Sequence, residues 1–114
     1  MNDVNELTTK RCQPCEGGME PLEPIVAQAL VGQVTDWAIS ADGRTITRRF
    51  EFKGFYKTMA FVNAMAWIAN QENHHPDFSC GYNYVVVNFT THAIGGLSEN
   101  DFICAAKVDA LLAE

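Results

Sequence analysis

The feature that most constrains the fold is an Asp-Gly pair, Asp42-Gly43, which separates two segments with strand-like sequence. Residues 37–40 form the first segment, and apolar and polar side chains alternate in the second, residues 45–52. Asp-Gly is the residue pair that a tight hairpin turn favours, because Gly adopts positive φ angles at no steric cost. The pattern therefore predicts an antiparallel β-hairpin over residues 37–52.

The clearest helical pattern follows this hairpin and covers residues 56–71. Phe61, Met65 and Ile68 recur at helical spacing, and neither Pro nor Gly interrupts the segment. Pro76 disfavours helical geometry at the residue before it, so we expect the helix to end there. Residues 77–80 and 84–91 then predict a second pair of strands around a short turn.

Shorter helices are expected on either side of these elements. One begins at Pro24, and another follows Ser98, which is a good N-cap residue with Glu99 and Asp101 placed in the first turn. The element order is then α-β-β-α-β-β-α, in which each of two hairpins is followed by a helix. This order predicts an α+β fold with one four-stranded antiparallel sheet and helices packed on one face.

The N-terminal residues show no clear periodicity. Residues 1–21 contain two glycines and two prolines, so we expect a flexible arm that precedes a domain formed by residues 22–114. Cys12 and Cys15 have the spacing of half a zinc site or of a redox pair. The other two cysteines lie 24 residues apart and do not complete a zinc site, so the role of the pair stays open.

Composition and charge exclude several classes of protein. Of 114 residues, 47% are hydrophobic and 19% are charged, which excludes a disordered chain. The formal net charge of −6 argues against nucleic acid and membrane surfaces as partners. No apolar run approaches the roughly 18–20 residues that cross a bilayer, and the first residues do not resemble a signal peptide. We therefore expect a single-domain cytoplasmic protein.

All three histidines, His74, His75 and His92, fall at the ends of predicted elements. If residues 77–80 pair with residues 84–91, His75 and His92 reach the same edge of the sheet, which predicts a pocket lined by up to three imidazoles. Imidazole exchanges protons near neutral pH and suits acid–base catalysis. The alternatives are a zinc site and exposed histidines that only cap element ends. A zinc site is disfavoured because adjacent side chains diverge and no His-x-His or His-x₃-His spacing occurs.

Four motifs occur together in the second half of the chain. They are His74-His75-Pro76-Asp77, the strand sequence of residues 84–87, Thr90-Thr91-His92, and the sequence GLSEND at residues 96–101. Together they resemble the signature of the pterin-4a-carbinolamine dehydratases. The resemblance covers roughly residues 22–112, and the segment around Cys12 also resembles the N-termini of bacterial members.

The resemblance implies a reaction and a set of site residues. Members dehydrate 4a-hydroxytetrahydrobiopterin to quinonoid dihydropterin without a metal or a cofactor, in the recycling of tetrahydrobiopterin. By position in the motif, His74 and His92 would be the acid–base pair and His75 would orient the pterin. The substrate-binding positions implied by the resemblance are these three histidines and Asn73, Thr90, Thr91 and Ala93.

The resemblance also implies partners and one departure. Members form homodimers or homotetramers and serve aromatic amino-acid hydroxylases, whereas relatives that only bind or assemble other proteins have lost the histidines. This sequence keeps all three, which favours catalysis over the alternative of a non-catalytic binding protein. Many members carry an acidic residue where this chain has Asn70, and Glu72 is the candidate to replace it.

Overall fold

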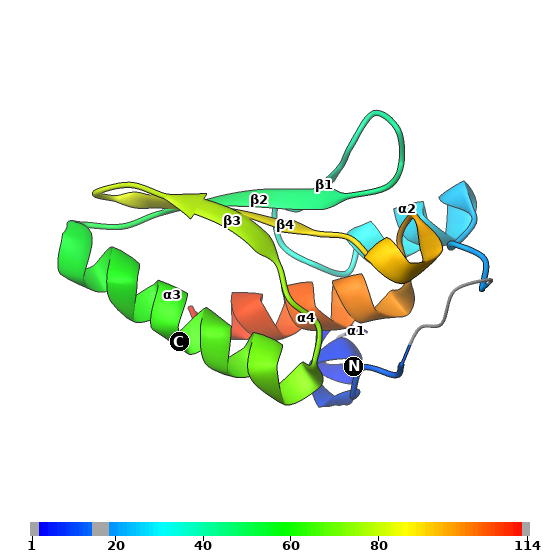
Figure 1. The fold of residues 1–114 in the computed structure, drawn as a ribbon, viewed down its shortest axis with the longest axis horizontal. Helices are drawn as coiled ribbons and strands as arrows, with labels where there is room; N and C mark the ends of the chain where they lie inside the picture. The colour runs from blue at the N-terminus through cyan, green and yellow to red at the C-terminus, as the bar shows by residue number, and fades with distance from the viewer. Residues whose placement is uncertain (1–2, 15–18, 113–114) are drawn as a thin grey trace.

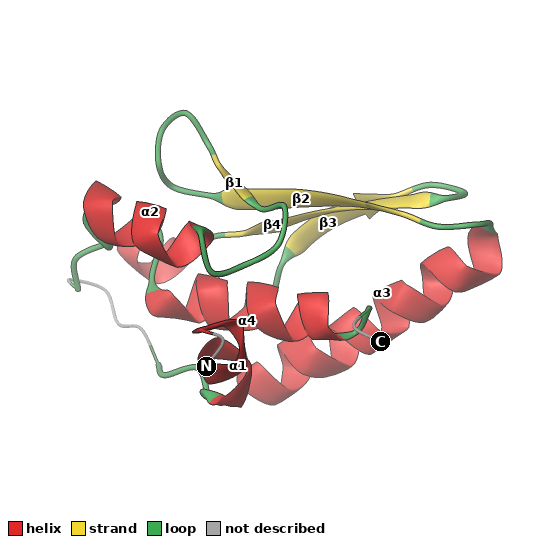
Figure 2. Cartoon of the chain, turned by 180° about the vertical axis from the view of Figure 1, so that it is seen from behind, coloured by secondary structure: helices red, strands yellow, loops and turns green. Residues whose placement is uncertain are grey.

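The computed structural model describes residues 3–14 and 19–112. The elements are α1 (Asp3–Thr9), α2 (Pro24–Val31), β1 (Ala38–Ile39), β2 (Ile46–Glu51), α3 (Phe55–Glu72), β3 (Asp77–Cys80), β4 (Tyr84–Phe89), η1 (His92–Ile94) and α4 (Glu99–Ala110). The strands form one four-stranded antiparallel sheet, and α1, α3 and α4 lie on one side of it (Figure 1; Figure 2). The predicted α+β class and its sheet are confirmed.

The Asp-Gly turn forms the predicted hairpin. β1 pairs antiparallel with β2, with Ile39 opposite Ile46. Gly43 adopts a φ of 75° and donates its N–H to the carbonyl of Ser40 at 2.9 Å. The strand order is β1-β2-β4-β3, so β4 lies in the interior of the sheet and β3 forms one edge.

The hydrophobic core fills the space between the sheet and the helices. Alternate residues of β2 and β4 face the helices, and those exposed by 2% or less are Ile46, Phe50, Val85, Val87 and Phe89. The predicted spacing in α3 is confirmed for Phe61 and Met65, which are buried, while Ile68 is partly buried at the margin. Burying each such side chain contributes roughly 1.5–3 kcal/mol relative to leaving it exposed.

Helix α4 runs through the middle of the molecule, and its residues 100–106 are all buried. It contacts α1, α2, α3 and β4, so most of its length is packed against other elements (Figure 1). The predicted N-cap is confirmed, because Ser98 and Asp101 form a capping box. Asp101 near the start of α4 and Asp109 near its end have side chains exposed by 0% and 8%, so these two charged groups require partners.

The structure places in the N-terminal segment a helix that the sequence analysis did not predict, and the flexibility of this arm stays a prediction. Residues 3–9 form α1, and Leu7, exposed by 1%, joins the core beside α4. Seven residues make about two helical turns, too short a window for a hydrophobic period to appear in the sequence. Residues 15–18, including Cys15, lie outside the described residues, and the domain boundary at residue 22 stays a prediction.

Candidate active site

A pocket of about 410 Å³ opens where the end of α3, the end of β4 and the start of α4 meet. Its lining contains all seven of the sequence-predicted site residues, Asn73, His74, His75, Thr90, Thr91, His92 and Ala93. The topology explains this, because Asp77 of β3 lies opposite Asn88 of β4, and the segments before β3 and after β4 therefore meet at one edge. The structure brings the seven residues together, and their roles stay predictions.

Asn73 positions the first histidine. It ends α3 in the left-handed conformation, with φ of 51° and ψ of 42°, and its N–H caps carbonyls of the last helical turn. Asn tolerates this conformation better than most residues with a side chain. The chain therefore turns sharply out of the helix, and the next side chain, His74, lies at the pocket.

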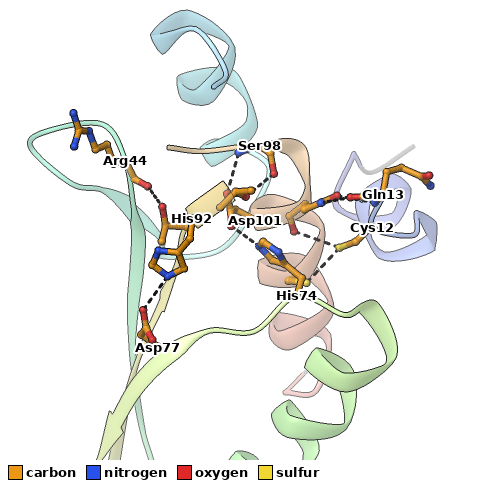
Figure 3. Close-up of polar contacts among 12 residues, drawn as sticks. Cys12, Gln13, Arg44, His74, Asp77, His92, Ser98 and Asp101 are labelled. Carbon is orange, nitrogen blue, oxygen red and sulfur yellow. Dashed lines mark hydrogen bonds and ion pairs between the residues drawn. The ribbon is translucent and has the colours of Figure 1, made fainter. Parts of the chain in front are cut away.

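The ring of His74 is fixed by a buried carboxylate. Its Nε2 lies 2.6 Å from Oδ1 of Asp101, and the two side chains are exposed by 11% and 0% (Figure 3). The imidazole also stacks on Phe89, with ring centroids 5.9 Å apart and an interplanar angle of 11°. These contacts on two sides of the ring set both its plane and the direction of its nitrogens.

Asp101 is held by further donors on its other oxygen. Oδ2 accepts hydrogen bonds from Oγ1 of Thr91 at 2.8 Å and from the N–H of Ser98 at 2.9 Å. An ionised carboxylate only accepts hydrogen bonds, so Nε2 of His74 is the donor in its contact with Asp101. In the neutral ring the proton is then on Nε2, and Nδ1 is the nitrogen that can accept a proton.

Sequence reasoning missed Asp101 as a site residue. It assigned this residue to the first turn of α4, and a separation of 27 residues from His74 leaves no local signal that links the two. The resemblance places an acidic residue where this chain has Asn70. In the structure the acidic residue that contacts His74 is Asp101, which comes from α4. Glu72 does not replace the acidic residue missing at position 70, since its Oε1 accepts the backbone N–H of Cys12 at 2.8 Å.

The other two histidines are exposed. His92 begins η1, the next element after β4, and its Nε2 lies 3.6 Å from Oδ2 of Asp77, with both side chains 77% exposed (Figure 3). Exposed pairs of this kind contribute little to stability, so His92 can change its contacts when a ligand enters. Thr90 lies beside it, and its Oγ1 donates to the carbonyl of Arg44 in the β1–β2 turn.

Two further observations concern the part of the chain that is described. In residues 3–14 and 19–112, no group of three or more His, Cys, Asp or Glu side chains is arranged to hold a metal ion. Among the helices of these residues, none has both the length and the apolar character needed to cross a membrane.

The sequence and the fold of this chain match those of known proteins. The family model described as pterin 4 alpha carbinolamine dehydratase matches residues 20–111. The chain belongs to this family. A relative from Nitrosomonas eutropha is 56% identical over 98% of both chains, and one from Legionella pneumophila strain Corby is 54% identical over 97% of this chain and 99% of its own. The names of both relatives provisionally assign them the same dehydratase activity.

Two solved structures share the fold of this family member. The crystal structure of a transcriptional coactivator/pterin dehydratase from Brucella melitensis has a TM-score of 0.77 and 29% identity, and the match covers 81% of this chain and 98% of that one. A pterin dehydratase-like protein identified as a RuBisCO assembly factor in the alpha-carboxysome has a TM-score of 0.61 and 26% identity. That match covers 70% of this chain and 93% of the neighbour.

Proposed function

We propose that the protein dehydrates pterin-4a-carbinolamine, a 4a-hydroxytetrahydropterin such as 4a-hydroxytetrahydrobiopterin, to quinonoid dihydropterin. The reaction would recycle the tetrahydropterin that an aromatic amino-acid hydroxylase consumes, and we place it in the cytoplasm. The observation that carries the proposal is the bond from His74 to buried Asp101 in a pocket that His92 also lines. Membership of the dehydratase family supports the choice of substrate.

The chemistry requires one proton acceptor and one proton donor. The C4a–O bond breaks, the proton on N5 is removed, and its electron pair forms the C4a–N5 double bond. In our proposal Nδ1 of His74 takes the N5 proton. Asp101, which contacts Nε2 on the other side of the ring, stabilises the imidazolium that forms. A carboxylate that is already buried and bonded needs no reorganisation as this charge appears.

His92 supplies the proton for the leaving group. As an imidazolium it donates to the departing hydroxyl, which leaves as water, and Asp77 balances its charge before the transfer. At the end His74 has gained one proton and His92 has lost one, so exchange with solvent restores both. Positioned acid–base groups of this kind contribute about 10²–10⁴-fold each to a rate.

The other predicted site residues differ in whether they contact only the pocket or also Asp101. His75, Asn73, Thr90 and Ala93 line the pocket, and we assign them to binding of the pterin. Thr91 also lines the pocket, but its hydroxyl donates to Asp101 and contacts Oγ of Ser98 at 2.7 Å. We therefore assign Thr91 a positioning role through Asp101 in addition to contact with the substrate.

The test is the rate at which 4a-hydroxytetrahydropterin decays, followed by its absorbance as it is generated by a hydroxylase. We expect the protein to accelerate the decay above the spontaneous rate and to do so equally with and without EDTA. No acceleration by folded protein would contradict the proposed activity. Loss of activity in EDTA, restored by a divalent metal, would contradict the metal-free mechanism and the expectation that no cofactor is required.

A second candidate function is a non-catalytic role in binding or assembling another protein. The likeness to the assembly factor, at a TM-score of 0.61, is the observation that favours it. The two functions make opposite predictions for the pocket. A protein that only binds partners would neither accelerate pterin decay nor change its stability when pterin is added.

We also propose that the protein forms a homodimer or homotetramer. β3 is an edge strand, all four of its residues are exposed, and Phe78 is 45% exposed. An open edge with an exposed aromatic side chain can pair with a second strand. Light scattering behind a sizing column tests this, and a monomeric mass at micromolar concentration would contradict it.

A further inference from the structure

The N-terminal segment forms part of the pocket wall. Cys12, Gln13 and Pro14 line the same pocket as the histidines. We call residues 11–14 the N-terminal strap. Figure 3 shows His74 between His92 on one side and Cys12 and Gln13 on the other. The strap precedes residues 20–111, which the family model matches, so the family model assigns it no role.

Glu72, at the end of α3, holds the first part of the strap. Its side chain is 5% exposed and lines the pocket. Its Oε1 accepts the N–H of Cys12 at 2.8 Å, and its Oε2 lies 2.9 Å from Nε of Arg11 and 3.7 Å from Nζ of Lys107. A buried carboxylate with a backbone donor and two cations is a strong attachment, because hydrogen bonds to charged groups are stronger than those between neutral groups.

Asn100, in the first turn of α4, holds the second part. It is 7% exposed, and its side chain bonds to both backbone groups of one residue. Gln13 donates its N–H to Oδ1 of Asn100 at 3.0 Å, and Nδ2 of Asn100 donates to the carbonyl of Gln13 at 2.6 Å. This paired contact fixes the backbone of the strap as an added strand would, whatever side chain Gln13 carries.

The two attachments come from the same elements that carry the proposed catalytic groups. Glu72 is two residues before His74 at the end of α3, and Asn100 immediately precedes Asp101 in α4. The strap is therefore fixed relative to His74 and Asp101. By contrast, the pair of Lys10 and Glu99 lies outside the pocket lining, and both side chains are about half exposed.

We propose that the N-terminal strap is a substrate-binding wall of the pocket, and that Glu72 and Asn100 are positioning residues that hold it against the bound pterin. This inference rests on the proposed function, because the pterin is the ligand it assigns to the wall. The strap sets affinity for the substrate and leaves the proton transfers to His74 and His92.

The first experiment uses trypsin and a fully oxidised pterin that cannot react. The bond after Arg11 is in the strap, and Arg11 has a 67% exposed side chain, so trypsin reports when the strap leaves its site. We expect saturating pterin to slow cleavage after Arg11 in the full-length protein by about tenfold, because the bound ligand is lost when the wall opens. Binding itself is measured separately by quenching of pterin fluorescence.

The second experiment compares matched variants. Asn100→Asp keeps the acceptor for the N–H of Gln13 but places a second acceptor against its carbonyl, and Glu72→Gln removes the charge that faces Arg11 and Lys107. We expect each to raise KM by about tenfold, the size of one lost hydrogen bond, with kcat within about twofold. Glu99→Gln breaks an ion pair beside the strap and should change neither value.

The outcomes separate this inference from the proposed function. If the wild type binds pterin but pterin leaves the rate of cleavage after Arg11 unchanged, the strap is not a wall of the binding site. The proposed function stands in that case. Equal KM in the wild type and in folded Asn100→Asp and Glu72→Gln would overturn it in the same way. A fall in kcat without a change in KM would also overturn it, and wild type that binds no pterin overturns both proposals.

Discussion

Replacing Asp101 by Asn changes the proton position on His74 while preserving the shape of the side chain. The carboxylate accepts from His74, Thr91 and Ser98 at 2.6, 2.8 and 2.9 Å. In Asp101→Asn the amide oxygen can accept from both Thr91 and Ser98 when the NH₂ group of the new side chain faces His74, and only then. Two donors cannot face each other, so Nε2 must lose its proton and Nδ1 must carry it.

The size of the effect follows from these contacts. A ring protonated at Nδ1 cannot accept the N5 proton, so we expect kcat to fall by about 10²–10⁴-fold, the contribution of a positioned general base. The amide keeps these contacts as neutral hydrogen bonds, which are weaker than bonds to a charge, so we expect the free energy of unfolding to fall by about 1–2 kcal/mol. Urea unfolding measures the second quantity, and pterin decay at saturating substrate measures the first.

Asp109→Asn is the matched control. Asp109 is a second buried carboxylate on the same helix, with an 8% exposed side chain, and it lies outside the pocket lining. It also accepts three hydrogen bonds, from Arg48, Trp37 and Thr35 at 2.7, 2.9 and 3.0 Å. We expect a comparable loss of stability with kcat retained. Equal losses of kcat in the two variants, or full kcat in Asp101→Asn, would refute the reasoning.

Three other predictions concern stability and the cysteines. Burial raises the pKa of Glu72, but the N–H of Cys12 and the cations Lys107 and Arg11 outweigh this effect and hold the pKa below its ordinary value of 4.5. Because the folded pKa is the lower one, Glu72 stabilises the fold above about pH 4.5 and this contribution is lost as the pH falls through the folded value. The difference in unfolding free energy between wild type and Glu72→Gln should shrink between about pH 6 and about pH 3, and a constant difference would contradict this. Met65→Ala should lower the free energy of unfolding by about 2–5 kcal/mol and leave kcat unchanged once folded, as urea melts and turnover will show. Diamide should join Cys12 to Cys104, whose Sγ atoms lie 3.5 Å apart, with loss of two hydrogens from the intact mass. The same loss in Cys104→Ser would exclude this pairing.

The parts of the fold that could be predicted are those with a strong local signal. The alternation in β2 and the Asp-Gly turn gave the hairpin, and Pro76 gave the end of α3 to within a few residues. α1 could not be predicted from periodicity, because it is short and is stabilised by burial of Leu7 against a helix about ninety residues away in sequence. The stability of α1 comes from tertiary packing, and the local sequence pattern carries no information about that packing.

The candidate site was predicted unevenly for a similar reason. The three histidines could be brought together because the pairing of β3 with β4 follows from two adjacent strand patterns. Asp101 was read only as a capping residue, and it is both a cap and the partner of His74. Its second role depends on how α4 packs against the end of α3, which no spacing in the sequence reveals.

The most direct test of the proposed mechanism is the dehydration rate of pterin-4a-carbinolamine catalysed by wild type, His74→Ala and His92→Ala under saturating substrate. We predict that wild type accelerates the reaction and that each substitution lowers kcat by about 10²–10⁴-fold while the variants stay folded. A wild-type rate in either folded variant would contradict the assignment of that histidine, and a wild-type rate in both would contradict the mechanism.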